Sequence, residues 1–242
     1  MKTILVVGIG TGNPEHLTVQ AINALNRADV LFIPDKGTGK ADLADLRREI
    51  VVRYVTNPAS YTVEYVVPRR DAANPDYEAG VDDWHAALAE RFAMLLLDVP
   101  ADGAGAFLVW GDPGLYDSTL RIIARLRDRF VVEVIPGITA IQALTAAHGI
   151  ALNRIGEPVH ITTGRRLGTV DEDTVVMLDG RTAFMTADPD LDIFWGAYLG
   201  TPDEITIAGR LADMREEIVA TRRAARERHG WIMDTYLLRK RE

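Results

Sequence analysis

A turn between a buried strand and a helix constrains the fold of this chain most. Residues 106–109, Ala-Phe-Leu-Val, form an apolar run typical of a buried parallel strand. Residues 110–118, Trp-Gly-Asp-Pro-Gly-Leu-Tyr-Asp-Ser, follow it, and apolar residues at helical spacing begin after Thr119. In an open α/β sheet, ligands bind at such turns, outside the carboxyl ends of the strands. The alternative is an ordinary strand–turn–helix connection made of common turn residues.

Two further turns have the same character. Residues 8–18, Gly-Ile-Gly-Thr-Gly-Asn-Pro-Glu-His-Leu-Thr, follow a strand predicted over 3–8, and residues 136–140, Pro-Gly-Ile-Thr-Ala, follow one over 131–135. Asn13 as N-cap and Pro14 as first helical residue predict a helix that begins there and runs through Leu25. Asn13 also stands where the dinucleotide fingerprint G-x-G-x-x-G needs its third glycine, so the pattern disfavours a nicotinamide or flavin site.

The order of predicted elements indicates two α/β domains, residues 1–150 and 151–242. Strands and helices alternate through residue 148, which predicts a mostly parallel, doubly wound layer. This first part also contains predicted strands over 30–33, 51–55 and 62–67, and predicted helices over 41–50, 82–98, 119–129 and 138–148. The second part has more strands than helices, which suggests a mixed or antiparallel sheet. Its strands are expected over 159–163, 174–178, 193–199, 204–208 and 231–238, with one helix over 211–228.

Composition excludes several classes of function. The net charge of −8 disfavours a nucleic-acid partner, which would need a basic face. Cysteine is absent, which excludes disulfides, thiolate metal sites and a cysteine nucleophile. The five histidines never pair at metal-ligand spacing, so we expect no metal site. No apolar run is long enough to span a bilayer, and the apolar opening is too short for a signal peptide, so we expect a cytoplasmic protein.

The remaining chemistry is a set of glycine-rich turns at strand ends. The two serines lie outside any G-x-S-x-G pattern, so a serine hydrolase is disfavoured. The acidic run at Asp188, Asp190 and Asp192 lacks the glycine and glutamate of a calcium loop. The glycine-rich turns themselves carry no lysine, and they suit a ligand held mainly by backbone groups.

Taken in order and spacing, the three turns resemble those of the tetrapyrrole methylases, an S-adenosylmethionine-dependent family of cobalamin and sirohaem biosynthesis. The resemblance covers essentially the whole chain, although Gly-Thr-Gly-Asn-Pro replaces the family's usual Gly-Pro-Gly-Asp-Pro. It implies two α/β domains, each with a mixed sheet flanked by helices, and S-adenosylmethionine in a cleft between them. It also implies a tetrapyrrole (precorrin) substrate and a homodimer.

The resemblance assigns cofactor contacts residue by residue. In the first part of the chain they fall at Thr11, Trp110, Gly111, Asp112, Leu115, Tyr116, Thr139 and Ala140. In the second part, Asp179 stands at the position of a family methionine, and Gly200 with Thr201 matches a later cofactor-facing pair. Asp112 has an alternative role, which is to cap a helix beginning at Pro113.

His16 is the candidate general base for a proton transfer. It follows the Gly-Thr-Gly-Asn-Pro turn directly, and an unperturbed histidine titrates closest to neutral pH. Glu15 and Tyr116 are its candidate catalytic partners, with Tyr61 and Tyr65 as further possibilities. The alternative is that His16 is an ordinary residue on a helix surface.

Three other functions stay open on the sequence. The first is another precorrin or uroporphyrinogen C-methyltransferase, acting at a different ring carbon. The second is a nucleotide-dependent oxidoreductase, which the broken glycine fingerprint disfavours. The third is a non-catalytic tetrapyrrole-binding module, since a cofactor site lined by backbone leaves few catalytic side chains to identify.

Overall fold

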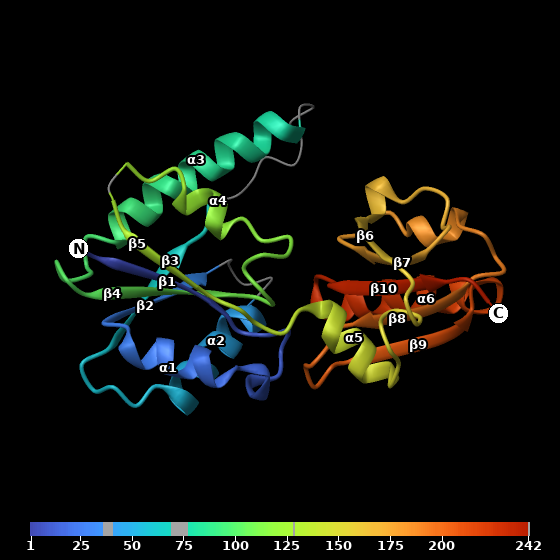
Figure 1. Ribbon diagram of the computed structural model, residues 1–242, viewed down its shortest axis with the longest axis horizontal. Helices are drawn as coiled ribbons and strands as arrows, with labels where there is room; N and C mark the ends of the chain where they lie inside the picture. The colour runs from blue at the N-terminus through green and yellow to red at the C-terminus, as the bar shows by residue number, and fades with distance from the viewer. Residues whose placement is uncertain (36–40, 69–76, 128, 242) are drawn as a thin grey trace. The chain divides into compact units, whose positions relative to one another are not determined.

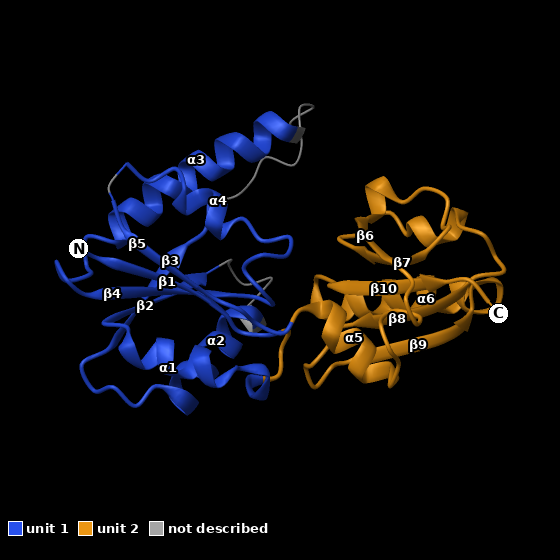
Figure 2. Ribbon diagram, viewed as in Figure 1, with its two compact units in different colours: residues 1–10, 14–138 blue, residues 11–13, 139–242 orange. Residues whose placement is uncertain are grey.

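A computed structural model describes residues 1–35, 41–68, 77–127 and 129–241. The chain forms two compact units (Figure 2). Unit 1 comprises residues 1–10 and 14–138, and unit 2 comprises residues 11–13 and 139–242. The change from unit 1 to unit 2 after Ile138 comes earlier in the chain than the predicted division after residue 150. Helix α5 (Ala140–His148) belongs to unit 2, because it packs on the strands of the second sheet.

Unit 1 is built on a five-stranded sheet with the order β3-β2-β4-β1-β5. Its strands are β1 (Thr3–Gly8), β2 (Val30–Asp35), β3 (Tyr61–Val66), β4 (Ala104–Val109) and β5 (Val131–Ile135). Every ladder between these strands is parallel, as the alternation of strands and helices predicts. The sheet is therefore a doubly wound parallel layer, whereas the family resemblance implied a mixed sheet in each domain.

Helices cover both faces of the first sheet (Figure 1). Helices α1 (Val19–Arg27) and α2 (Ala41–Tyr54) lie on one face, and α3 (Tyr77–Leu95) and α4 (Thr119–Ile123) lie on the other. Alternate residues of the inner strands β1, β2 and β4 pack into the two cores. Leu5 packs with Leu25 on the first face, whereas Ile4 packs with Phe92 on the second. Because both faces are covered, the strands are apolar on both sides, which is why they read as continuous apolar runs.

The predicted helix from Pro14 to Leu25 is wrong at its start. Pro14–His16 forms a short 3₁₀ turn, η1, and α1 begins only at Val19. Thr18 is the N-cap of α1, and its hydroxyl accepts a hydrogen bond from the Ala21 amide at 3.0 Å. The cap at Thr18 therefore competes successfully with the Asn-Pro start signal five residues earlier.

Two other predictions about helices need correction. The β-branched residues at 51–55 predicted a strand, but α2 continues through them to Tyr54, because Val51 packs against the same core as Ile50. The helix predicted over 119–129 ends at Ile123, as helix α4 of five residues. In α2, tertiary packing therefore overrides the local β propensity.

Unit 2 is built on a second five-stranded sheet with the order β6-β7-β10-β8-β9. Its strands are β6 (Val159–Thr163), β7 (Asp173–Met177), β8 (Asp192–Ala197), β9 (Ile205–Arg210) and β10 (Asp234–Arg239). Only β6 and β7 pair in parallel, so this sheet is mixed, as predicted. Helix α6 (Leu211–His229), the 3₁₀ turns η3 (Gly164–Arg166) and η4 (Ala183–Thr186) and α5 complete the unit.

Large aromatic residues fill the centre of unit 2. Trp195 and Tyr236 are fully buried on neighbouring strands, and the Phe184 ring meets the Tyr236 ring edge-on, with centroids 5.3 Å apart. Among the helices that the structure describes, none combines the length and the apolar character needed to cross a bilayer.

Candidate functional site

The carboxyl ends of β1 and β4 form the switch point of the parallel sheet. The chain leaves β1 towards α1 on one face and leaves β4 towards α4 on the other (Figure 1). Just beyond the two strands, Gly10 and Gly111 pair as an isolated antiparallel bridge. The Gly111 amide donates to the Gly10 carbonyl at 2.8 Å, and the Gly10 amide donates to the Gly111 carbonyl at 3.3 Å. Ligands of doubly wound folds bind at this kind of crevice.

Glycines allow three strand ends to meet at this point. A Cβ atom added to Gly137, which follows β5, would lie 2.2 Å from the Gly111 carbonyl oxygen. A Cβ atom added to Gly8 would lie 2.6 Å from the Gly137 amide nitrogen. Both neighbours are backbone atoms and cannot rotate away. The approach of β1, β4 and β5 therefore requires residues without side chains.

Asp112 holds two of these turns together. Its Oδ1 accepts a hydrogen bond from the Gly114 amide at 2.7 Å, and its Oδ2 accepts one from the Gly137 amide at 2.9 Å. No α-helix begins at Pro113, because α4 starts at Thr119, so the helix-capping alternative for Asp112 is wrong. The carboxylate joins the turn after β4 to the turn after β5, and each oxygen keeps a second lone pair for a ligand hydroxyl.

The other predicted residues of the turn after β4 lie at the surface or just below it. Trp110 and Leu115 are half-buried, and the Leu115 amide donates to the Asp112 carbonyl at 3.2 Å. Tyr116 is 43% exposed and has a backbone φ of 51°. A positive φ is rare for a bulky residue, and such conformations cluster at functional sites. The prediction of Tyr116 as a site residue is compatible with this strained, exposed position.

His16 packs directly on the glycine bridge. A Cβ atom added to Gly10 would lie 2.3 Å from the His16 Cβ atom, so His16 is stacked against the Gly10 backbone. The side chain is half-buried on a 3₁₀ turn, rather than displayed on an α-helix as the alternative supposes. Its role as a base stays a prediction, but its place beside the switch point suits that role.

Of the candidate partners of His16, Glu15 lies next to it in the chain, and Tyr61 and Tyr65 belong to β3. The exposed Glu15 carboxylate accepts a hydrogen bond from Arg53 of α2 at 2.7 Å. Tyr61 is the first residue of β3 and lies at the amino edge of the sheet, where its hydroxyl donates to the Asp98 carbonyl at 3.0 Å. It is therefore at the wrong edge to assist His16. Tyr65 lies nearer the carboxyl edge but is buried.

The candidate residues before α1 and after β8 meet within unit 2. Thr11 is buried, and a Cβ atom added to its neighbour Gly12 would lie 2.3 Å from Thr201 Cγ2. The Thr201 hydroxyl donates to the Tyr198 carbonyl at 2.7 Å, and the Gly200 amide donates to Glu204 at 2.7 Å. The structure thus brings together two segments that the resemblance had assigned to one cofactor site.

Thr139 and Ala140 begin helix α5. The Thr139 hydroxyl accepts a hydrogen bond from the Ile141 amide at 3.1 Å, and the Thr139 amide donates to Gln142 Oε1 at 3.1 Å. These contacts form a capping box, which gives the Pro-Gly-Ile-Thr-Ala motif a structural reason for its hydroxyl. Ala140 is the first helical residue.

Asp179 is buried in unit 2 and fully engaged with its own chain. Its Oδ2 accepts hydrogen bonds from the Tyr236 hydroxyl at 2.8 Å and the Ala183 amide at 2.6 Å, and Oδ1 accepts one from the Arg181 amide at 2.9 Å. Burial beside this carboxylate raises the pKa of Tyr236, so the phenol stays a donor. These contacts favour a structural role, in which Asp179 holds the turn after β7.

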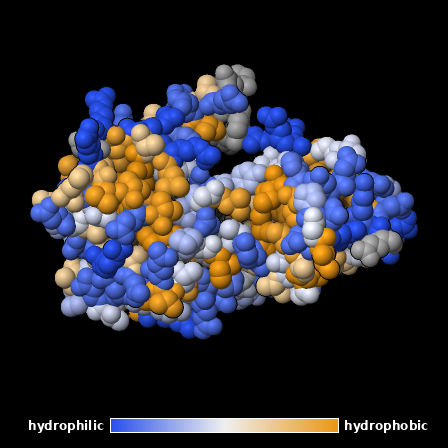
Figure 3. All heavy atoms as spheres, in the orientation of Figure 1, coloured by the Kyte–Doolittle hydropathy of each residue, from blue (hydrophilic) through white to orange (hydrophobic). Residues whose placement is uncertain are grey.

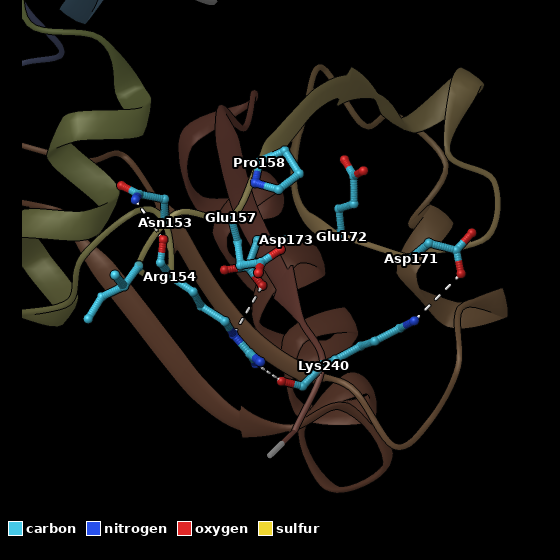
Figure 4. A pocket seen from close by; sticks show the side chains of 9 residues that line it. Asn153, Arg154, Glu157, Pro158, Asp171, Glu172, Asp173 and Lys240 are labelled. Atoms are coloured by element: carbon cyan, nitrogen blue, oxygen red, sulfur yellow. Dashed lines mark hydrogen bonds and ion pairs between the residues drawn. The ribbon is translucent and has the colours of Figure 1, made fainter.

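A pocket of about 620 Å³ lies elsewhere in unit 2, at the amino ends of β6 and β7 (Figure 4). Charged side chains line it, and two ion pairs join four of them. Lys240 lies 3.5 Å from Asp171, and Arg154 lies 3.8 Å from Asp173. The turn at Asp179 is at the other end of β7, so this pocket is separate from the candidate residues of that unit.

Sequence reasoning missed Arg47 of α2. This arginine is only 5% exposed, and its Nε donates to the Leu108 carbonyl of β4 at 3.0 Å. Its guanidinium carbon lies 6.0 Å from the centre of the Trp110 ring. No local pattern distinguishes it from the charged residues around it, because its burial depends on the packing of α2 against the sheet.

Comparison with known proteins agrees with this architecture. The family model of the tetrapyrrole (corrin/porphyrin) methylases matches residues 3–215. A precorrin-6A synthase [deacetylating] from Sinorhizobium sp is 56% identical over 99% of this chain and 96% of its own length. A precorrin-2 C(20)-methyltransferase from the same source is 35% identical over 74% of each chain.

A solved structure shares this fold over its full length. The crystal structure of a cobalamin synthesis related protein (CobF) from Corynebacterium diphtheriae covers all of both chains, with 44% identity and a TM-score of 0.87. The glycine-built switch point, the two α/β units and these matches lead to one assignment: this chain belongs to the tetrapyrrole (corrin/porphyrin) methylase family.

Proposed function

We propose that this chain is an S-adenosylmethionine-dependent C-methyltransferase of cobalamin biosynthesis. Its reaction would be methylation of precorrin-5 at carbon 1, with release of acetate, to give precorrin-6A. The observation that carries the proposal is the 56% identity, over nearly the whole chain, to a deacetylating precorrin-6A synthase. Methylation at another ring carbon, as the name of the precorrin-2 C(20)-methyltransferase states for that relative, is the second candidate.

The turns at the switch point fit a methyl-donor cofactor held by backbone groups. Gly8 and Gly137 let the backbones of the three strand ends come together, and Asp112 offers carboxylate lone pairs beside them. We propose that Trp110, Gly111, Asp112 and Leu115 hold S-adenosylmethionine in unit 1. The contacts implied at Thr11, Thr139, Ala140, Asp179 and Gly200 stay predictions.

The proposed reaction has two steps, methyl transfer and acetate release, and each has its own requirement. The cofactor supplies an electrophilic methyl group, so for this step the residues need only orient the nucleophilic ring carbon and exclude water. Release of acetate needs more. The oxygen of a water molecule bonds to the acetyl carbonyl carbon and its proton passes to a base. The carbon–carbon bond then breaks and acetate leaves, and the electron pair left on the ring carbon bonds either to a proton or to the methyl group. We propose His16 as that base.

The proposed reaction is tested by incubating the purified protein with labelled S-adenosylmethionine and a panel of precorrins. We expect label to enter precorrin-5 with release of acetate. Label in a different precorrin, without acetate, would assign the second candidate instead. Binding of tetrapyrrole with no transfer of label would indicate a binding module, and hydride transfer from a nicotinamide would indicate an oxidoreductase.

Replacing Gly111 with valine is expected to weaken S-adenosylmethionine binding by about tenfold or more, because a side chain would block close approach to the backbone. Gly111 has a φ of 70°, so the variant also carries backbone strain. Gly149→Val is the matched control, since Gly149 has a φ of 63° and open space around it. Calorimetry on both folded variants gives the comparison. Equal affinities for the cofactor would refute the placement.

We further propose a homodimer, which rests on the family resemblance. Figure 3 shows apolar side chains gathered on unit 1 where Figure 1 draws β5. Val131, Val132 and Val134 of this edge strand are each more than 40% exposed. Light scattering at micromolar concentration is expected to give twice the mass of the chain, and a monomeric mass would contradict the proposal. The cytoplasmic location and the lack of a nucleic-acid partner also stay predictions.

A further inference from the structure

The first sheet separates at its carboxyl edge, between β2 and β4. These two strands pair at only three positions, ending at Phe32 and Phe107. Beyond them, the ladder between β2 and β3 continues for three more pairs, and the ladder between β4 and β1 continues for two. Beyond Phe32 and Phe107, β2 and β4 therefore no longer pair with each other. This happens at the end of the sheet where doubly wound folds bind their ligands.

Arg47 reaches from α2 into this separation. Its Nε donates to the carbonyl of Leu108, the first β4 residue beyond the last pair with β2. Its Nη1 donates to the Leu43 carbonyl on its own helix at 2.6 Å. The guanidinium also lies beside the Trp110 ring, which begins the turn after β4. The side chain thus joins helix, strand end and turn.

Among the residues that the structure describes, no carboxylate forms an ion pair with Arg47. Burial lowers the pKa of the guanidinium to about 10, so the group remains positive at neutral pH. Tyr65 and Asp117 lie close enough to raise that pKa, but neither forms an ion pair with it among the described residues. A buried charge without an opposite charge in contact is costly. Such a site is completed when a ligand supplies the anion.

Tyr65 of β3 is a second donor near Arg47: its ring packs edge-on against Phe92 on the α3 face, and it lies close enough to Arg47 to affect the pKa of the guanidinium. Its side chain is 8% exposed, and burial raises its pKa, so it keeps its proton. Neither the Tyr65 hydroxyl nor Nη2 of Arg47 makes a hydrogen bond to another part of the chain that the structure describes. A cation and a neutral donor with unused hydrogens suit a carboxylate, which accepts two hydrogen bonds from an arginine and more from a hydroxyl.

We propose that Arg47 and Tyr65 bind a carboxylate side chain of the substrate tetrapyrrole. This inference rests on the proposed function. It names a carboxylate as the substrate group that binds between the ends of β2 and β4. Precorrins carry acetate and propionate side chains, so the anion is available on the substrate. The position next to the Trp110–Tyr116 turn places the bound carboxylate beside the residues proposed to hold the cofactor.

The test is a comparison of steady-state methylation of precorrin-5 by the wild type, Arg47→Met and Tyr65→Phe. We expect the KM for the tetrapyrrole to rise about 10- to 100-fold in Arg47→Met, the usual effect of losing a hydrogen-bonded charge. Tyr65→Phe keeps the ring and is expected to raise the KM about threefold to tenfold. The dissociation constant of S-adenosylmethionine, measured by calorimetry, should change less than twofold in both.

Two controls separate recognition from structure. Arg48→Gln removes a neighbouring arginine of α2 that pairs with Glu64 and Asp45 at the surface, and it should leave the KM unchanged. Asp117→Asn can still accept the hydrogen bond from the Thr119 amide. If Asp117 were the counter-charge of Arg47, this variant would raise the KM as well, and that result overturns the proposal.

The remaining outcomes are also decisive. If Arg47→Met fails to fold, Tyr65→Phe decides alone, and an unchanged KM in that variant overturns the proposal. A parallel loss of tetrapyrrole and cofactor affinity in both variants would assign Arg47 and Tyr65 a structural role instead. A wild type that methylates no tetrapyrrole refutes the proposed function itself. An active wild type with unaltered variants refutes only the carboxylate site.

Discussion

Arg222→Met is expected to destabilise unit 2 by about 3–5 kcal/mol, the usual cost of breaking a buried ion pair by removing one partner. Arg222 of α6 donates to Asp234 through Nε at 2.8 Å and through Nη2 at 3.2 Å. The Trp195 indole donates to the same carboxylate at 2.8 Å. The two charged side chains are only 12% and 5% exposed, so the variant would leave a buried carboxylate without its cation.

The loss should be local to unit 2. Arg222 also donates to the Asp179 carbonyl at 2.6 Å, so it links α6 to the turn after β7. Hydrogen exchange followed by mass spectrometry can report the two units separately. We expect faster exchange in β8 and β10 and no change in β1 and β4. Arg210→Met is the control, because Arg210 pairs with Asp190 at the surface and such pairs contribute about 0–1 kcal/mol. Equal effects of the two variants would contradict the prediction.

The pH dependence of the Arg222→Met variant gives a second test. Burial raises the pKa of the Asp234 carboxyl, and the Arg222 charge and the hydrogen bonds from Arg222 and Trp195 oppose that rise. Without Arg222 the rise grows, so the folded variant binds a proton at a pH where the unfolded chain has lost it. Stability then falls as pH increases through the folded pKa. The deficit relative to the wild type should therefore shrink as the pH is lowered from 7 towards 5.

The strands and the glycine turns were predictable because their signals are local. Buried parallel strands appear as continuous apolar runs, and Gly8, Gly111 and Gly137 stand directly after such runs. The start of α1 was mispredicted, although a signal existed. Thr18 is a good N-cap, but Asn13 and Pro14 offered a competing start.

Other features depend on contacts between distant parts of the sequence. Asp179 is buried, and its carboxylate accepts a hydrogen bond from Tyr236, 57 residues later, so a match to one motif position could not reveal its role. Arg47 stands 61 residues before the carbonyl that it binds. Its significance depends on the early end of the β2–β4 ladder, which no local pattern encodes. A buried charge of this kind is found only when strand register and helix packing are both known.

His16→Ala is expected to slow acetate release by about 10² to 10⁴-fold, the range for removal of a general base or acid. His16, which we propose as that base, packs against Gly10 beside the Gly10–Gly111 bridge, where the ends of β1 and β4 meet. Addition of water to the acetyl carbonyl requires a proton acceptor, whereas transfer of a methyl group from a sulfonium does not. The two products should therefore respond differently when the base is lost, so labelled methyl incorporation and acetate must be followed separately.

Two further variants make this comparison specific. His16→Asn keeps a polar side chain against Gly10 but provides no base, so it should slow acetate release as His16→Ala does. His160→Ala removes an exposed histidine of β6 in unit 2 and should leave both products unchanged. Methyl incorporation with stalled acetate release in both His16 variants would support the role of the imidazole. Acetate release at the wild-type rate, with normal methylation, would remove His16 from the mechanism and leave it as a residue that packs against the glycine bridge.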